Sequence, residues 1–93
     1  MLRLDSIHLH TLTVAIRENL KGTEAENIPH ILEELGEYAK EVNDGNKEKS
    51  KKELADLILA CLVCYDKYYG SDIDLITPAK KWLSNQGEKC VVQ

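Results

Sequence analysis

The sequence predicts an all-α fold in which two long helices form an antiparallel hairpin. Apolar residues recur at intervals of three and four over most of the chain, and no segment shows the apolar–polar alternation of a strand between turn signals. The apolar content is mainly Leu, Ile, Val and Ala, with no Phe, which is typical of helix bundles. Because 93 residues are too few for a second core, we expect a single domain over residues 1–93.

The composition excludes several classes of protein. A net charge of −4 and a pI near 5.3 disfavour binding to a nucleic-acid polymer or to an anionic membrane surface. No apolar run approaches the roughly 20 residues needed to cross a bilayer, and Met1–Asp5 does not resemble the start of a signal peptide. We therefore expect a cytoplasmic protein without a membrane partner. In that compartment Cys61 and Cys64, which lie in an apolar run, are expected to be reduced, buried thiols.

The first half of the chain predicts two helices and a turn. The first helix is expected over residues 5–20, with Asp5 or Ser6 as N-cap, and residues 21–27 read as a polar linker. The second helix is expected to start near Asn27 and Pro29, because Asn caps helices and Pro is tolerated in a first turn. Residues 43–46 (NDGN) form a strong turn signal that ends it.

Two further helices are expected after this turn. The third covers about residues 47–69 and ends at Gly70. Its start has two candidates: Asn46 as a cap, or a later start at a Ser50–Glu53 capping box. A last short helix is expected from a Thr77 cap to about Gln86.

The second helix carries an acidic stripe beside its apolar face. The apolar face comprises Ile31, Leu35, Tyr38, Ala39 and Val42. The stripe comprises Glu34, Glu37 and Glu41, with Glu33 at its outer edge. Like charges three residues apart destabilise a helix by a few tenths of a kcal/mol, so this stripe is either a solvated surface or a binding site.

The third helix favours a binding site. Eleven of the thirteen residues from Glu53 to Tyr65 are apolar and cover the whole circumference, which is typical of a helix buried on all sides. Only Glu53 and Asp56 interrupt this run, and buried carboxylates normally pair with cations or metals. The alternative is that Lys49 and Lys52 pair with them and that Glu53 serves as a capping residue.

The two pairs of acids also match across the predicted hairpin. If the chain turns at Gly45, Glu34 faces Asp56 and Glu37 faces Glu53. Four carboxylates then converge, and two charges about 5 Å apart repel by roughly 3 kcal/mol at an effective dielectric constant near 20. A hard divalent cation relieves this repulsion, and all-oxygen ligation favours Mg²⁺, or Mn²⁺ in its place, over Zn²⁺.

These residues resemble the motifs of a known family. Residues 33–37 (EELGE), residues 53–56 (ELAD) and the Lys81–Asn85 segment (KWLSN) resemble the motifs of the MazG-like, all-α nucleoside triphosphate pyrophosphohydrolases, over about residues 28–85. The resemblance implies an oligomer built from four-helix cores, either a homodimer or a dimer of dimers. It also implies Mg²⁺-dependent hydrolysis of a nucleoside triphosphate between its α and β phosphates. The metal ligands that it implies are Glu34, Glu37, Glu53 and Asp56.

The remaining site residues are expected from this chemistry. Glu33 or Glu34 would accept the proton of the attacking water. Lys81, with Lys80, would neutralise the β and γ phosphates, and Asn85 belongs to the same motif. Trp82 either stacks on the base or packs in a subunit interface. The three histidines, His8, His10 and His30, are not expected to bind a metal. The rival hypothesis is a non-catalytic helical dimerisation module in which the acidic hairpin is only structural.

Overall fold

The computed structural model describes residues 6–85, and this part of the chain is helical with no strand. Its four helices are α1 (Ser6–Asn19), α2 (Glu24–Asn43), α3 (Lys47–Tyr69) and α4 (Ile76–Asn85). The predicted all-α class is therefore confirmed. None of these helices combines the length and the apolar character that crossing a membrane requires.

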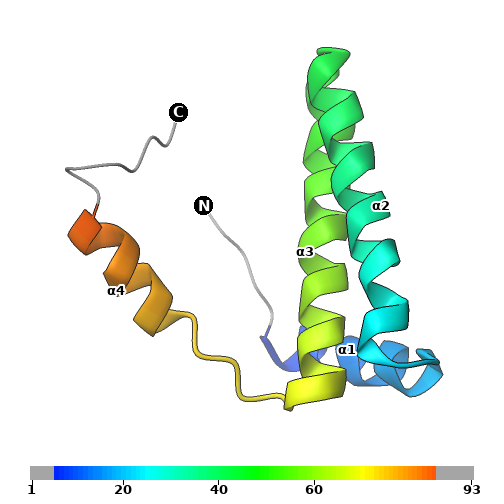
Figure 1. The fold of residues 1–93 in the computed structure, drawn as a ribbon, viewed down its shortest axis with the longest axis vertical. Helices are drawn as coiled ribbons and strands as arrows, with labels where there is room; N and C mark the ends of the chain where they lie inside the picture. The colour runs from blue at the N-terminus through cyan, green and yellow to red at the C-terminus, as the bar shows by residue number, and fades with distance from the viewer. Residues whose placement is uncertain (1–5, 86–93) are drawn as a thin grey trace.

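The centre of the molecule is the antiparallel hairpin of α2 and α3 (Figure 1). Asp44 caps the end of α2, Gly45 adopts a left-handed φ of +73°, and Asn46 caps the start of α3 by accepting a 3.1 Å hydrogen bond from the Lys49 amide. The predicted turn is confirmed, and Asn46 rather than Ser50 starts the third helix. Ser50 lies inside the helix, where its hydroxyl donates to the Asn46 carbonyl at 2.7 Å.

The start of α2 differs from the prediction. The helix begins at Glu24, three residues before the expected Asn27, and Pro29 lies inside it. A capping box explains the difference: the Thr23 hydroxyl accepts from the Glu26 amide at 3.2 Å, and the Glu26 carboxylate accepts from the Thr23 amide at 2.8 Å. The sequence interpretation missed this Thr-x-x-Glu signature and gave the cap to Asn27.

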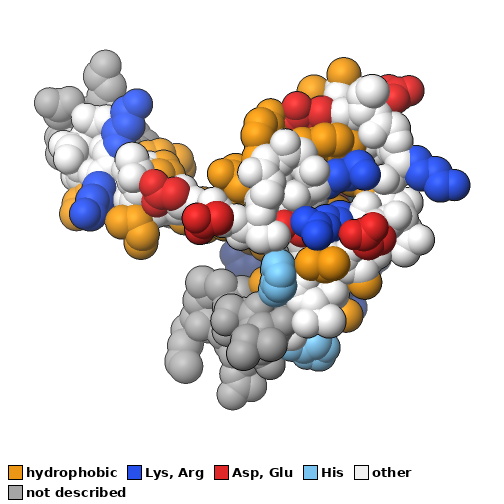
Figure 2. Space-filling model, turned by 90° about the horizontal axis from the view of Figure 1, so that it is seen from below, with side chains coloured by type: hydrophobic (Ala, Val, Ile, Leu, Met, Phe, Trp, Pro, Cys, Tyr) orange, Lys and Arg blue, Asp and Glu red, His pale blue; other side chains and the backbone are white. Residues whose placement is uncertain are grey.

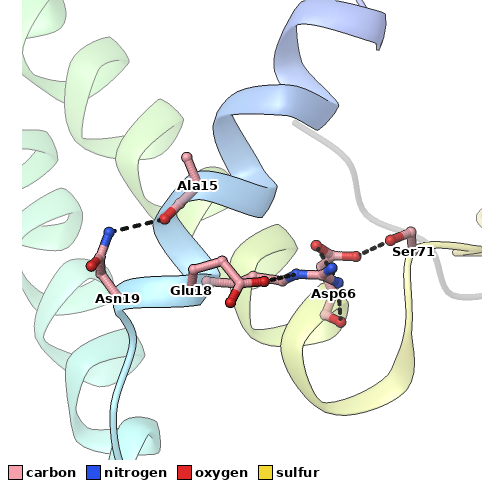
Figure 3. Close-up of polar contacts among 6 residues, drawn as sticks. Ala15, Glu18, Asn19, Asp66 and Ser71 are labelled. Carbon is pink, nitrogen blue, oxygen red and sulfur yellow. Dashed lines mark hydrogen bonds and ion pairs between the residues drawn. The ribbon is translucent and has the colours of Figure 1, made fainter.

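The first helix crosses the base of the hairpin and contacts α3 (Figure 1). The Arg17 guanidinium lies 3.2 Å from the Asp66 carboxylate and 3.5 Å from the Asp66 carbonyl oxygen. Ser71, in the segment after α3, donates a hydrogen bond to the same carboxylate (Figure 3). Asp66 is buried, so this ion pair fixes α1 against the end of α3 where the chain leaves the hairpin.

A second set of hydrogen bonds holds the α1–α2 loop. Asn27 donates to the Tyr68 hydroxyl at 2.7 Å, and that hydroxyl donates to the Gly22 carbonyl at 3.2 Å. The Tyr69 hydroxyl donates to the Glu24 carboxylate at 2.6 Å. The start of α2 and the end of α3 are therefore joined at the base of the hairpin.

The fourth helix stands apart from the other three. Asp74 caps it by accepting hydrogen bonds from the amides of Ile76 and Thr77, so the predicted Thr77 cap is wrong. The helix contacts no other helix of the described chain (Figure 1). Its hydrophobic and lysine side chains are gathered on a projecting segment (Figure 2), and Trp82 and Leu83 are 67% and 70% exposed. The predicted caps at Asp5 and the helix end at Gln86 lie outside the described residues.

The hairpin has two different faces. Six exposed aliphatic side chains form an apolar ridge on one face. They are spaced by three, four and seven residues along α2 (Ile28, Leu32, Leu35 and Val42) and by four residues along α3 (Leu54 and Ile58). At about 100° per residue, Glu37 and Asp56 point to the opposite face.

The two cysteines of α3 are not both buried. In the single chain Cys61 is exposed and Cys64 is half-buried, so the expectation of two buried thiols is wrong for the single chain.

Candidate metal centre

Three carboxylates meet on the acidic face of the hairpin. Glu34, Glu37 and Glu53 each place a carboxylate oxygen within 4.8 Å of the other two. Glu34 and Glu37 come from α2, one turn apart, and Glu53 comes from α3. The antiparallel pairing that brings them together is the one expected from a turn at Gly45.

Asp56 does not join this group of three. It is exposed on α3, one turn beyond Glu53, and its charge acts on the Glu53 carboxyl. The expectation that all four oxygens converge is therefore correct only in part. Asp is one methylene shorter than Glu, so from the same face its carboxylate reaches less far toward α2.

The electrostatics of this cluster are those of a site without a counter-charge. One oxygen of Glu34 and one of Glu53 are buried and have no hydrogen-bond partner. Burial raises the pKa of Glu53 above its usual 4.5, and a hydrogen bond with Glu37 and the negative charges of Glu37, Asp56 and Glu34 raise it further. A cation bound between these oxygens would satisfy them and remove the repulsion.

Among the described residues, no lysine or arginine pairs with these carboxylates. Within residues 6–85, no ion pair joins a Lys or Arg to Glu34, Glu37, Glu53 or Asp56, so the predicted alternative with Lys49 and Lys52 is not observed. Oxygen donors without nitrogen or sulfur are the ligands that Mg²⁺ and Mn²⁺ prefer. The residues present therefore fit a hard divalent cation.

The sequence interpretation missed His30 as a neighbour of this cluster. Its Nε2 lies 4.0 Å from a Glu34 carboxylate oxygen, and His30, Glu33 and Glu34 form a second close group. The spacing of His30 and Glu34 indicates this contact, because residues four apart on a helix are neighbours. Glu33 is exposed, whereas the Glu34 side chain is only 14% exposed. Glu34 is thus the residue common to both groups.

A cavity of about 210 Å³ adjoins the acidic cluster. It lies between α1 and the hairpin, and Glu34 and Asp56 line it together with His30. The rest of its wall is formed by Ile16 of α1, by Leu20 just after this helix, and by apolar side chains and Cys64 of α3. The cluster and the cavity therefore make one continuous site with a charged end and an apolar end.

The predicted phosphate-binding residues lie elsewhere in the single chain. Lys80, Lys81, Trp82 and Asn85 are all exposed on α4. Because α4 contacts no other helix of the described chain, the structure does not bring them to the acidic cluster. Within one copy, the carboxylates and the cavity are assembled and the basic residues are not.

The fold and the site define a class: an all-α protein with a carboxylate cluster, suited to a divalent cation, on a helical hairpin. Residues 22–77 match the model of the MazG nucleotide pyrophosphohydrolase domain. That match spans more than half of the chain and includes all four acids, so the protein belongs to the MazG family, as its motifs indicated. Comparison with curated proteins and with solved structures found no match.

Proposed function

We propose that this protein hydrolyses nucleoside triphosphates between the α and β phosphates, giving a nucleoside monophosphate and pyrophosphate. The observation that carries the proposal is the cluster of Glu34, Glu37 and Glu53, in which one buried oxygen of Glu34 and one of Glu53 have no hydrogen-bond partner. Membership in the MazG family supports nucleotide pyrophosphohydrolysis as the chemistry. Control of the nucleotide pool, or removal of unwanted nucleotides, is the role that fits it.

Mg²⁺, or Mn²⁺ in its place, is the proposed cofactor. Glu34, Glu37 and Glu53 would hold it, and Asp56 would complete the ligand set from the next turn of α3. When bound, the cation supplies a Lewis acid for the phosphate and lowers the pKa of a ligated water.

The proton of the attacking water needs an acceptor that is not fully engaged with the metal. Glu33 fits this role because it is exposed and lies beside Glu34 at the edge of the cluster. Glu34 is the alternative acceptor, but its burial suits a ligand better. Glu33 would therefore hold the proton while the bond to pyrophosphate breaks.

Lys80 and Lys81 remain the proposed counter-charges for the β and γ phosphates, together with Asn85. They can serve only if α4 packs against a hairpin, either its own or that of another copy, since it contacts none in the single chain. Trp82 would then pack in that new contact or against the base. Docking of α4 is thus part of the proposed catalytic state.

Assembly into a homodimer, or a dimer of dimers, is proposed from the apolar ridge. Two hairpins that pack through this ridge form a four-helix bundle and leave both acidic faces outward. Sedimentation of the full chain at micromolar concentration is expected to give at least a dimer. A stable monomer of 10.5 kDa would contradict this assembly.

The activity is tested by pyrophosphate release. The full chain with Mg²⁺ is incubated with a panel of canonical and modified ribo- and deoxynucleoside triphosphates, and the products are separated. We expect monophosphate and pyrophosphate in equal amounts from wild type and neither from Glu53→Gln. If no triphosphate is cleaved, the rival function gains support: a helical dimerisation module, which the exposed apolar ridge would also serve.

A further inference from the structure

We propose that a second cavity, at the base of the hairpin, receives the Trp82 side chain of another copy of the chain. The cavity has a volume of about 230 Å³ and lies between α1, the end of α3 and the connecting segment of residues 70–75. It shares no lining residue with the cavity beside the acidic cluster. The proposal therefore concerns a separate docking site and does not depend on the proposed hydrolysis.

The wall of this second cavity suits a flat apolar group. Leu9 of α1, Leu62 and Tyr65 of α3, and Ile73 of the connecting segment contribute aliphatic and aromatic surface to it. An apolar cavity of ~150 Å³ is large enough for a benzene molecule. A volume of about 230 Å³ therefore has room for the two fused rings of an indole.

The wall also presents a hydrogen-bond acceptor that is not used. The Asp66 side chain lines the cavity and is only 6% exposed, and its Oδ1 accepts the hydrogen bond from Ser71 (Figure 3). Its Oδ2 lies 3.2 Å from Arg17 Nη1 as an ion pair, but that nitrogen donates its hydrogen bond to the Asp66 carbonyl oxygen. Oδ2 has no hydrogen-bond partner among the described residues. Because buried polar atoms are normally hydrogen-bonded, Oδ2 is a site for a donor that enters the cavity.

The donor that fits this oxygen is neutral. Arg17 already balances the charge of Asp66, so a second cation in the cavity would be buried without a counter-charge. The indole N–H of tryptophan is a neutral donor that usually has a hydrogen-bond partner when it is buried. Trp82 carries the only indole of the chain, and it is 67% exposed.

The connecting segment directs Trp82 away from the cavity of its own chain. Ser71 is hydrogen-bonded to Asp66, and Ile73 forms part of the cavity wall. Asp74 then caps α4, so the helix starts close to the cavity and leads away from the other helices (Figure 1). Trp82 lies ~9 Å along α4 from its first residue. A Trp82 side chain that enters this cavity without breaking these contacts therefore belongs to a second copy.

The charges beside the cavity and on α4 are complementary. Asp72 and Asp74 of the connecting segment are exposed next to the cavity. α4 contains no acidic residue, and Lys80 and Lys81 are exposed directly before Trp82. In a two-fold arrangement each copy both provides and receives one Trp82, so each basic α4 meets the acidic connecting segment of the other copy.

Sedimentation of the full chain tests this exchange. Trp82→Ala should raise the dissociation constant of the contact by at least about 30-fold, as is typical of a central tryptophan in an interface. The mass should then fall to half that of wild type at a concentration at which wild type is assembled. Leu83→Ala is the control, because it removes an α4 side chain that is 70% exposed, and it should change the dissociation constant by less than about fivefold. An unchanged mass of Trp82→Ala would overturn the proposal.

Filling the cavity provides the reciprocal test. Ile73→Trp places an indole in the wall of the receiving cavity and should also halve the mass, whereas Leu75→Trp, at a position that is 60% exposed, should assemble as wild type does. An equal mixture of Ile73→Trp and Trp82→Ala should contain assemblies of the wild-type mass, because one variant retains Trp82 and the other an open cavity. Circular dichroism establishes that the variants fold. A mixture that stays at half the mass would overturn the exchange between copies.

A competitor tests the hydrogen bond in the unmodified protein. Free 3-methylindole should dissociate this contact and should be at least about tenfold more effective than 1,3-dimethylindole, which has no N–H, because a hydrogen bond to a charged group contributes about a tenfold difference or more. The measured quantity is the concentration of each compound that halves the mass in sedimentation. Equal effects of the two compounds, or no effect of either, would overturn the pairing of Trp82 with Asp66.

Discussion

The Glu37 and Glu53 carboxyls meet across the α2–α3 hairpin, where a hydrogen bond between them helps to raise the pKa of Glu53. Two carboxylates can share a hydrogen bond only when one of them holds a proton. The contact therefore favours the protonated form of Glu53, whereas a cation bound here would favour the charged form of the same group. The same contact thus connects protonation, metal binding and stability.

Glu53→Gln should separate metal binding from folding. Mg²⁺ at about 100 times its dissociation constant should stabilise wild type by about 2.7 kcal/mol per site, and this gain should largely disappear in the variant. The metal-free variant should be at least as stable as wild type, because one of the repelling charges has been removed. Thermal melts with and without Mg²⁺ measure both effects.

Glu41→Gln provides the matched control. Glu41 lies on the same helix as Glu34 and Glu37 but belongs to neither group of potential ligands. Its Mg²⁺ response should equal that of wild type. An equal response in all three proteins would contradict a metal site at Glu53.

The raised pKa of Glu53 predicts a pH dependence of stability in the absence of metal. A carboxyl whose pKa is higher in the folded protein binds more protons folded than unfolded, so its contribution to stability is present below its ordinary pKa of 4.5 and is lost as pH rises through the raised value. Metal-free wild type should therefore lose stability relative to Glu53→Gln as pH rises above about 4.5. Parallel melting curves at all pH values would contradict this prediction; saturating Mg²⁺ should reverse the trend in wild type.

Loss of Arg17 should destabilise the whole fold. Arg17→Met leaves the buried Asp66 carboxylate without its ion pair, and breaking a buried pair from one side costs about 3–5 kcal/mol. We expect about 3 kcal/mol by urea denaturation, since the Arg17 side chain is 30% exposed and water replaces part of the interaction. Lys40→Met breaks the exposed pair with Asp44 and should cost less than about 0.5 kcal/mol. Similar losses in the two variants would contradict the role of the Arg17–Asp66 pair.

Thr23→Ala should cost about 1 kcal/mol, because it removes the hydroxyl that caps α2. Thr77→Ala serves as the comparison. The sequence predicted that Thr77 caps α4, whereas in the structure Asp74 provides the cap. Its effect on amide hydrogen exchange in α4 should be small, whereas Asp74→Ala should speed exchange at Ile76 and Thr77. The opposite order in α4 would restore Thr77 as the cap.

The hairpin was the most predictable part of the fold. Its two helices have long, regular apolar repeats, and the NDGN turn between them allows one antiparallel register. The spacing of Glu37 and Glu53 around Gly45 then predicted their contact. These features depend on local rules and one turn, so the sequence determines them directly.

The errors have two origins: one local signal that was overlooked, and contacts that no local pattern specifies. Pro29 and Asn27 were strong local signals for a helix start, but the Thr23–Glu26 capping box begins the helix one turn earlier. The pairing of Arg17 with Asp66 joins residues 49 positions apart, and no local sequence pattern predicts it. Whether Lys81 approaches the acids depends on the packing of α4, which helical periodicity does not specify.

The separation of α4 also determines how this protein can be observed. Trp82 is the only tryptophan in the chain, and among the helices of residues 6–85 it lies on the one that contacts no other. Fluorescence excited at the long-wavelength edge of the tryptophan absorption band therefore comes from α4 alone and carries no information on the hairpin. Ellipticity, in contrast, comes mostly from α2 and α3, the two longest helices. The two signals follow different parts of the molecule, so a shift of the emission to shorter wavelength on adding nucleotide or raising protein concentration would record the docking of α4 without any attached label.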